Sequence, residues 1–379
     1  MAAAPLEGLK VIELARILAG PWIGQTLADL GATVIKIESP QGDDTRGWGP
    51  PFIERGEERS AAYFHSCNRG KRSVVADLNK ASDQAFVREL VAEADVFVEN
   101  FKVGGLAKYG LDYATLERLN PRLVYCSVTG FGQDGPYAER AGYDFMIQGL
   151  SGIMDITGEP DGEPQKIGVA FADLFTGLYG VIGIQAALAQ RRTSGRGQHV
   201  DMALLDCMTS VLANQALNYL ASGTSPTRLG NAHPNIAPYQ TFPSRDGHLI
   251  VACGNDAQFE RLAEVLQLPT LVSDARFSSN ELRVEHRQAL EVLLSERTQQ
   301  FARDDLIERL TQAAVPAGPI NTVADAFADP QIKHRGIEIE IDGVPSVRTP
   351  IRFSDAELTL NLPSPKLGEH TEAVKKQPW

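Results

Sequence analysis

Short apolar runs alternate with helical patterns along the first third of the chain. Between the first two runs, Pro21–Leu30 has the periodicity of a helix, with Pro21 where a first turn tolerates proline and Gly31 where a helix can end left-handed. Strands separated by helices indicate a parallel, doubly wound sheet. The segments that we predict as its strands are Lys10–Leu14, Thr33–Ile37, Ser73–Leu78, Asp95–Glu99 and Leu123–Val128.

The second half of the chain predicts a further, smaller domain. A long helix from about Leu174 to Arg191 ends in the basic, glycine-rich loop Arg192–Gln198, which precedes a strand. After the turn-rich connector Ala221–Thr227, a strand and three amphipathic helices are typical of an α+β unit. Because 379 residues exceed the usual size of one hydrophobic core, two domains are expected. The predicted elements are strand His199–Ala203, helix Asp206–Leu220, strand Leu249–Ala252, helices Ala257–Leu266, Glu285–Glu296 and Arg303–Ala313, and paired strands Ile337–Ile341 and Ser346–Phe353.

Composition excludes several classes of partner. The 36 Lys and Arg against 48 Asp and Glu give a net charge of -12, which argues against nucleic acid or an anionic membrane as the main partner, although a local basic patch could still hold a phosphorylated ligand. The four cysteines are scattered without a CxxC pair, so we expect reduced, buried thiols and no metal site. No secretory signal is indicated, which favours the cytoplasm. The uncharged stretch Leu174–Gln190 is short for a bilayer span and is interpreted as a core helix.

The βαβ pattern raises one rival function, an NAD-dependent dehydrogenase. Glu38 follows the second predicted strand, where such enzymes place the acid that binds the ribose. However, the turn after the first strand, Ala15–Gly24, lacks the G-x-G-x-x-G sequence that lets a backbone approach a pyrophosphate. Dinucleotide binding is therefore not expected.

Asp173 stands directly before an apolar helical run, so its simplest local interpretation is a helix N-cap. A helix N-terminus also keeps a carboxylate ionised, and an ionised carboxylate can attack an acyl carbon. The apolar neighbours Val169, Phe171 and Leu174 would limit water, which would otherwise hydrolyse an acyl-aspartyl anhydride. The two interpretations are compatible, and the local pattern alone does not choose between them.

Three other polar segments are either surface loops or ligand contacts. The segment Gly142–Asp144 follows a glycine-rich turn, where glycines permit close approach to a ligand and the Tyr143 hydroxyl could orient a carboxylate. Prolines rigidify Arg228–Gln240, which favours a functional loop. The basic tract Asn68–Ser73 could be a solvated turn or could meet a phosphate.

Taken in this order, these segments resemble the class III coenzyme A transferases, the family that includes formyl-CoA transferase and the 2-methylacyl-CoA racemases. The similarity runs from Leu6 to about Thr371. The motifs that carry it are Leu6–Leu14, Leu18–Pro21, Asp29–Glu38, Asn68–Ser73, Val98–Phe101, Gly130–Pro136, Ala172-Asp173 and Gly195–Gln198. Each is weak singly, but eight in register make the resemblance specific.

The resemblance implies an α/β fold: a Rossmann-like large domain at 1–200 completed by 330–379, a linker at 201–225 and a small domain at 226–325. It also implies an interlocked homodimer of ring-shaped subunits, and coenzyme A as substrate without a prosthetic group. Lys108 stands where formyl-CoA transferase has an arginine, and Ser39 replaces another, so phosphate contacts near Ser39 are not expected. The implied coenzyme A contacts are Leu18, Ala19, Lys71, Arg72, Asn100, Phe101 and Lys108.

Tyr143 separates the two branches of the family. Racemases place a histidine at this position as one of two proton carriers, and a tyrosine with an ordinary pKa of roughly 10 is a poor substitute near neutral pH. Transfer is therefore favoured, with Asp173 as the nucleophile that the resemblance implies. The chain is most similar to the branch that uses succinyl-CoA and dicarboxylates such as glutarate or hydroxymethylglutarate. The candidate substrate contacts are Arg46, Arg140, Tyr143, His233, Tyr239, Gly254 and Asn255, the last two in a glycine loop over the site or in a plain strand-to-helix turn.

The implied reaction passes through an acyl-aspartyl anhydride and an aspartyl-CoA thioester. Exchange of one thioester for another is nearly thermoneutral, so neither ATP nor a metal is required, and the enzyme must hold the reactants together and keep water out. Two alternatives stay open: an isomerase of 2-methylacyl-CoA, and a non-catalytic coenzyme A-binding subunit that pairs with a different chain.

Overall fold

The computed structural model describes residues 3–379, which form two compact units. The first unit comprises the chain up to Ile153 together with Ile167–Leu212 and Pro330–Trp379. The second comprises Met154–Lys166 and Ala213–Asp329. Residues 154–166, expected in the large domain, belong to the second unit because Gly230 N donates to Gly158 O at 3.1 Å.

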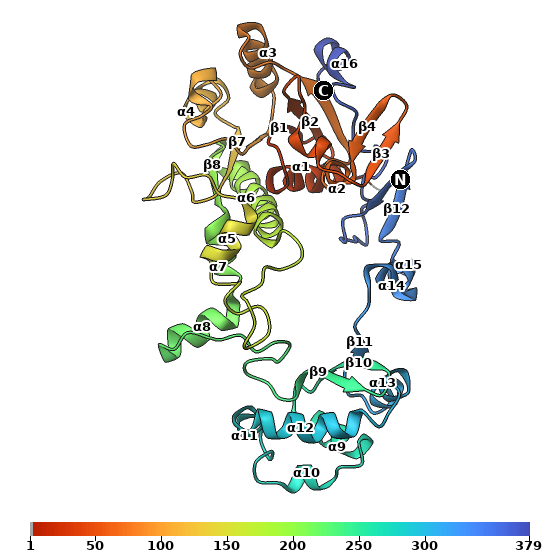
Figure 1. Cartoon of the computed structure of the whole chain (residues 1–379). Helices are drawn as coiled ribbons and strands as arrows, with labels where there is room; N and C mark the ends of the chain where they lie inside the picture. The colour runs from red at the N-terminus through yellow and green to blue at the C-terminus, as the bar shows by residue number, and fades with distance from the viewer. Residues whose placement is uncertain (1–2) are drawn as a thin grey trace. The chain divides into compact units, whose positions relative to one another are not determined.

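A six-stranded parallel sheet organises the first unit (Figure 1). The sequence predicts the parallel sheet and five of its strands, and the sixth, β8, is the strand predicted at His199–Ala203 without a place in the sheet. Its strand order is β5-β2-β1-β6-β7-β8. The bounds are β5 Lys71–Val75, β2 Thr33–Glu38, β1 Lys10–Leu14, β6 Val96–Glu99, β7 Val124–Thr129 and β8 His199–Ala203. The third predicted strand was placed too late in the sequence, because β5 pairs with β2 from Lys71 onward and buries polar side chains there.

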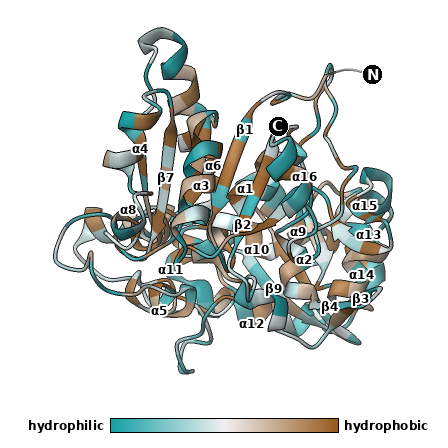
Figure 2. Ribbon diagram, turned by 90° about the horizontal axis from the view of Figure 1, so that it is seen from above, coloured by the Kyte–Doolittle hydropathy of each residue, from teal (hydrophilic) through white to brown (hydrophobic). Residues whose placement is uncertain are grey.

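Helices cover both faces of the sheet, so the first unit has three layers. Successive side chains of β1 point to opposite faces of the sheet. Val11 packs with helices α1 (Ala19–Asp29) and α6 (Phe171–Ser194) on one face. Ile12 packs with helices α3 (Ala81–Ala92), α4 (Tyr113–Leu119) and α16 (Thr371–Lys376) on the other. Strands buried on both faces read as continuous apolar runs, and β1 is drawn mostly in the hydrophobic colour of Figure 2.

The C-terminal segment returns to the first unit after the second unit is complete. Its helix α16 packs beside β5, where His370 N donates to Ser73 O at 2.9 Å and Val75 N donates to Thr371 Oγ1 at 3.1 Å. A hairpin turns at Asp342-Gly343, with a shorter second strand than predicted. The remaining elements are η1 Asp44–Gly47, β3 Phe52–Arg55, β4 Glu58–Ala61, α2 Ala62–Ser66, η2 Ala107–Tyr109, α5 Asp144–Leu150, α7 Leu204–Ser210, α15 Pro330–Arg335, β12 Glu338–Ile341 and β13 Val344–Val347.

The second unit packs helices against a three-stranded antiparallel sheet of order β11-β10-β9. Its core joins Phe242 and Leu249 of the sheet to Phe259 and Leu290 of the helices. The strand β9 was not predicted, because Pro243 interrupts its pattern, and proline is tolerated here on an edge strand. The elements are α8 Ala213–Ser222, β9 Tyr239–Ser244, β10 Gly247–Ala252, α9 Asp256–Val265, α10 Thr270–Ser273, α11 Asn280–Glu285, α12 Arg287–Thr298, α13 Arg303–Gln312, β11 Ala317–Pro319 and α14 Val323–Ala328.

Candidate active site

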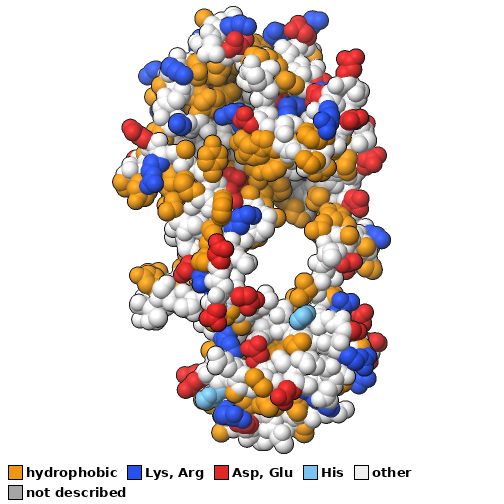
Figure 3. All heavy atoms as spheres, in the orientation of Figure 1, with side chains coloured by type: hydrophobic (Ala, Val, Ile, Leu, Met, Phe, Trp, Pro, Cys, Tyr) orange, Lys and Arg blue, Asp and Glu red, His pale blue; other side chains and the backbone are white. Residues whose placement is uncertain are grey.

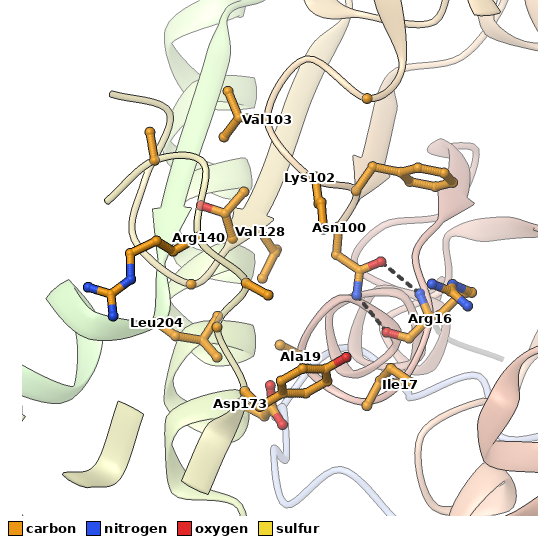
Figure 4. Close-up of a pocket in the computed structure, with 18 of the residues that line it drawn as sticks. Arg16, Ile17, Ala19, Asn100, Lys102, Val103, Val128, Arg140, Asp173 and Leu204 are labelled. Carbon is orange, nitrogen blue, oxygen red and sulfur yellow. Dashed lines mark hydrogen bonds between the residues drawn. The ribbon is translucent and has the colours of Figure 1, made fainter. Parts of the chain in front are cut away.

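A cavity of about 410 Å³ opens at the carboxyl ends of β1, β6 and β7 in the first unit (Figure 4). The strand order reverses between β1 and β6, since β2 and β5 lie on one side of β1 and β6, β7 and β8 on the other. Ligands of open parallel sheets bind at such a switch point, where the loops after neighbouring strands diverge. Lining residues include Arg16 to Ala19, Asn100 to Val103, Gly105, Lys108, Tyr109, Val128 to Gly130, Ala138, Arg140 to Asp144, Asp173 and Leu204.

Asp173 reaches this cavity from the first turn of α6, but it is not the cap of that helix. Ala170 occupies the N-cap position and contributes no side-chain hydrogen bond. Instead, Asp144 Oδ1 accepts from Ala172 N at 2.8 Å, so a second carboxylate caps α6. No described residue donates a hydrogen bond to the Asp173 carboxylate, which leaves its oxygens free to react.

The environment of Asp173 opposes its ionisation. Burial, and then the neighbouring Asp144 carboxylate, raise the pKa of Asp173 to about 7. Tyr63 of α2 lies near the same charge: burial, and then Asp173, raise the pKa of its phenol. A carboxylate with few hydrogen bonds is poorly solvated, and its ionised form at or above neutral pH is therefore a stronger nucleophile than an exposed aspartate.

The rest of the cavity is cationic although the chain is acidic overall. Four cations line it (Arg16, Lys102, Lys108 and Arg140) against two acids, Asp144 and Asp173, a difference of +2. Arg16 also forms an exposed ion pair with Asp44 of η1. Such a cavity suits a ligand that carries several negative charges.

Five of the seven coenzyme A contacts implied by the resemblance line the cavity: Leu18, Ala19, Asn100, Phe101 and Lys108. Lys71 does not. Its ammonium group is fully buried and contacts Glu13, Pro21 O, Cys67 O and the side chain of Asn68, all within 3.0 Å. Arg72 is also outside the lining and donates to Pro378 O at 3.5 Å. Lys71 of the basic tract therefore stabilises the core, because buried oxygen acceptors surround its ammonium group.

Two of the candidate substrate contacts, Arg140 and Tyr143, line the cavity. The Arg140 guanidinium lies 4.4 Å from the ring centre of Tyr137, and Figure 4 shows it extending away from Asp173. Arg46 was expected here and is placed elsewhere. Its guanidinium forms a double hydrogen bond with Glu38, at 2.7 and 2.9 Å, and a third bond with Glu58 at 2.9 Å.

The other candidates belong to the second unit. His233 Nδ1 accepts from Asn235 N at 3.1 Å, and its ring lies 5.2 Å from that of Tyr239. Burial, and then Arg287, lower the pKa of His233. Asn255 caps α9 through Gln258 N, and Gly254 N donates to the Gln258 side chain at 2.6 Å. Within this unit, Gly254 and Asn255 therefore form the strand-to-helix turn that was one of the two predicted interpretations.

Sequence reasoning missed several residues that line the cavity, among them Arg16, Ile17, Lys102 and Tyr109. Arg16 and Ile17 follow the end of β1 by two and three residues, and Lys102 follows the end of β6 by three. The rule that ligands bind beyond the carboxyl ends of the strands flanking a switch point would have selected them. Tyr63 gave no signal in the sequence, because it approaches Asp173 from a distant part of the chain.

A second cavity of about 230 Å³ lies at the carboxyl ends of β1, β2 and β5. It shares Arg16, Phe101 and Tyr109 with the first cavity, so the two adjoin along these side chains. Ser39, predicted to lack a phosphate contact, lines it. Among residues 3–379, no group of three or more His, Cys, Asp or Glu side chains is placed to hold a metal ion.

Comparison with known proteins decides which family this site represents. Residues 6–371 match the family described as CoA-transferase family III. This chain belongs to CoA-transferase family III. It is 57% identical over 378 residues to a succinate–glutarate CoA-transferase of Agrobacterium fabrum, with 98% of this chain and 94% of that protein covered.

One further sequence match and one structural match agree with the family assignment. The chain is 41% identical over 379 residues to the human succinyl-CoA:glutarate CoA-transferase, covering 98% of this chain and 86% of that protein. Its fold is similar to the crystal structure of a CaiB/BaiF family protein from Brucella suis, with a TM-score of 0.90, 66% identity and full coverage of both chains. The chain is thus a CoA-transferase with a mixed α/β fold.

Proposed function

We propose that this CoA-transferase moves coenzyme A from succinyl-CoA to a dicarboxylate, with glutarate as the first acceptor to test. The observation that carries the reaction is the Asp173 carboxylate, which lines a cationic cavity at the switch point of the sheet without a hydrogen-bond donor of its own. The names of the Agrobacterium and human relatives support the choice of substrates.

The proposed cycle uses one carboxylate oxygen of Asp173. This oxygen attacks the thioester carbon of succinyl-CoA, the C–S bond breaks, and coenzyme A leaves as a thiolate from a mixed anhydride. The thiolate then attacks the aspartyl carbonyl carbon, which releases succinate and leaves an aspartyl-CoA thioester. An acceptor carboxylate attacks the carbonyl carbon of that thioester, its C–S bond breaks, and a second mixed anhydride and free thiolate form. The thiolate then attacks the acceptor acyl carbon of this anhydride, which gives the new acyl-CoA and releases the Asp173 carboxylate. Acyl carriers of this kind require a site that limits water.

Coenzyme A is proposed to span the two adjoining cavities. Its nucleotide would occupy the cavity at Ser39, and its pantetheine arm would enter the cavity that holds Asp173. Arg16, which lines both, would meet phosphate between them, with Lys108 nearby on η2. Phe101 and Tyr109 also line both cavities and offer ring faces to the arm.

The free carboxylate of a dicarboxylate acyl group needs a cation that is not committed elsewhere. Arg140 is our candidate, because its guanidinium lies against the rings of Phe131 and Tyr137 and forms no ion pair with any residue in the described range 3–379. Replacement of Arg140 by glutamine is expected to raise KM for glutarate about tenfold, while a monocarboxylate acceptor of the same length keeps its KM.

The test offers purified protein succinyl-CoA and a panel of acids, and separates acyl-CoA products by chromatography. New acyl-CoA with glutarate, and loss of turnover in Asp173→Ala, are the expected results. Mass spectrometry after quenching should find coenzyme A or an acyl group on the peptide that contains Asp173. Exchange of an α-proton in heavy water without an acceptor acid would instead indicate an isomerase, and activity only after adding a second polypeptide would indicate a binding subunit.

We also propose that the enzyme acts as an interlocked homodimer in the cytoplasm. Among the described residues, helix α6 is long and apolar enough, by length and composition alone, to cross a membrane. For the dimer, what matters is that only 33% of its apolar stretch is buried within the chain. Figure 3 shows hydrophobic side chains at the surface of the first unit, and an apolar area of this kind favours a protein interface. The exposed large hydrophobic residues of α5 and α6 are Phe145, Met146, Leu150, Leu178, Tyr179 and Ile182. Light scattering should give twice the chain mass, and Ile182→Asp should lower it; a monomeric wild type would contradict the proposal.

A further inference from the structure

Ile17 lines the catalytic cavity in a backbone conformation that its side chain disfavours. Its φ is 75°, in the left-handed region, where a β-branched residue is a true outlier. For a residue with a Cβ atom this region is roughly tenfold less populated than the right-handed one. Ile17 joins β1 to α1, so its conformation sets the direction in which Leu18 and Ala19 enter the cavity wall. Outliers of this kind persist only where the surroundings hold them.

Side chains hold the backbone polar groups that lead into this outlier, from Ala15 O to Ile17 N. Asn100 bonds both polar groups of Arg16: its Oδ1 accepts from Arg16 N at 3.0 Å, and its Nδ2 donates to Arg16 O at 2.7 Å. Both bonds are drawn in Figure 4. Asp43 Oδ1 accepts from Ile17 N at 3.3 Å, and Lys36 Nζ donates to Ala15 O at 2.7 Å.

These side chains are themselves fixed by buried contacts. Lys36 and Asp43 are buried and lie 3.0 Å apart, and Lys36 also lies 3.0 Å from Glu13. Asp43 Oδ1 additionally accepts from the backbone N–H and the hydroxyl of Thr45. Buried ion pairs contribute little net stability, but their geometry is narrowly defined. The loop from Ala15 to Ile17 is therefore clamped from β2, from the loop after β2 and from the end of β6.

We infer that Asn100 and Asp43 are positioning residues, which hold Ile17 in its left-handed conformation and thereby fix the wall of the cavity that adjoins Asp173. The resemblance implies Asn100 as a coenzyme A contact. In the structure both hydrogen-bonding ends of its amide are committed to Arg16, so it acts on the substrate through the backbone. This inference rests on the proposed transfer reaction for its kinetic readout.

A double-mutant cycle tests the inference. Glycine adopts a positive φ without penalty, so an Ile17→Gly background no longer needs the clamp. Asn100→Ala is expected to lower kcat about tenfold in the natural background and less than threefold in Ile17→Gly, with KM for succinyl-CoA changed less than twofold in both. Any effect of Ile17→Gly itself cancels in the comparison.

Asn120→Ala is the matched control. Asn120 also clamps backbone through its amide, donating to Val91 O at 3.0 Å and Ala94 O at 2.8 Å, but it lies outside both cavities. It should lower the melting temperature without changing kcat. If Asn100→Ala does not fold, Asp43→Asn replaces it, since it keeps an oxygen for Ile17 N while removing the charge that faces Lys36; a kcat loss that Ile17→Gly reduces is again expected.

Two outcomes would overturn the inference. An equal loss of kcat in both backgrounds means that the clamp does not act through the conformation of Ile17. A rise in KM for succinyl-CoA with unchanged kcat means that Asn100 contacts coenzyme A directly. A wild-type enzyme without transferase activity would instead contradict the proposed function, which keeps the two failures distinct.

Discussion

Replacement of Asp173 by asparagine should abolish transfer and yet stabilise the protein at neutral and alkaline pH. Asparagine is nearly isosteric with aspartate, so the cavity and its neighbours are kept. What the substitution removes is a titrating carboxyl group whose pKa is raised from 3.8 to about 7 by burial and by Asp144. Such a group stabilises the folded state only while it stays protonated.

The size of the effect follows from this pKa. A rise of about three corresponds to about 4 kcal/mol, at about 1.4 kcal/mol for each unit of pKa. The cavity is open to water on one side, which screens the charge, so we expect about half of this, about 2 kcal/mol. Because the folded state binds the proton more tightly than the unfolded chain, the stability of the wild type falls from about pH 4 to about pH 7. Asp173→Asn lacks this decline, so its advantage grows over the same range and is complete by pH 8.

Urea unfolding followed by tryptophan fluorescence measures this difference. The three tryptophans, Trp22, Trp48 and Trp379, all belong to the first unit, so the signal reports the unit that holds Asp173. Exposed Asp134 of the same unit offers a matched control, because Asp134→Asn makes the same chemical change outside the cavity. If Asp173→Asn and the wild type differ by the same free energy at pH 5 and pH 8, the assigned environment of Asp173 is wrong.

Further predictions concern pH and the cationic residues. For the wild type, kcat/KM should rise with pH through about 7, since only ionised Asp173 attacks the thioester; a flat profile between pH 5 and pH 8 would contradict this. Asp144→Asn removes the neighbouring charge, so the rise should move to lower pH, while the asparagine oxygen can still accept from Ala172 N and keep the cap of α6. Lys71→Ala leaves Glu13 buried with one partner fewer and should destabilise the fold by about 3 kcal/mol. Lys108→Ala should leave the unfolding midpoint unchanged and raise KM for succinyl-CoA, and the reverse pattern would restore Lys71 as a coenzyme A contact.

The sequence by itself determined the architecture of the first unit, because the relevant signals are local. The strands Lys10–Leu14 and His199–Ala203 have the bounds predicted for them, since apolar periodicity and flanking turns act within a few residues. The sequence also selected Asp173, although through the order of its motifs and not through the local pattern, which favoured a helix cap. The structure assigns that cap to Asp144, which stands 29 residues earlier and bonds to Ala172.

Only the tertiary structure decided which charges reach the cavity. Lys71 and Lys108 are both basic residues near predicted strands, but Lys71 points to Glu13, 58 residues away in sequence, whereas Lys108 lines the cavity. Arg46 likewise forms ion pairs with Glu38 and Glu58 and does not line the cavity. Burial and pairing of a charge depend on residues that are distant in the chain, and so does the pKa of Asp173, which depends on a carboxylate from another helix. Local sequence patterns predict the fold, while the chemistry of the site depends on contacts that form only when the chain has folded.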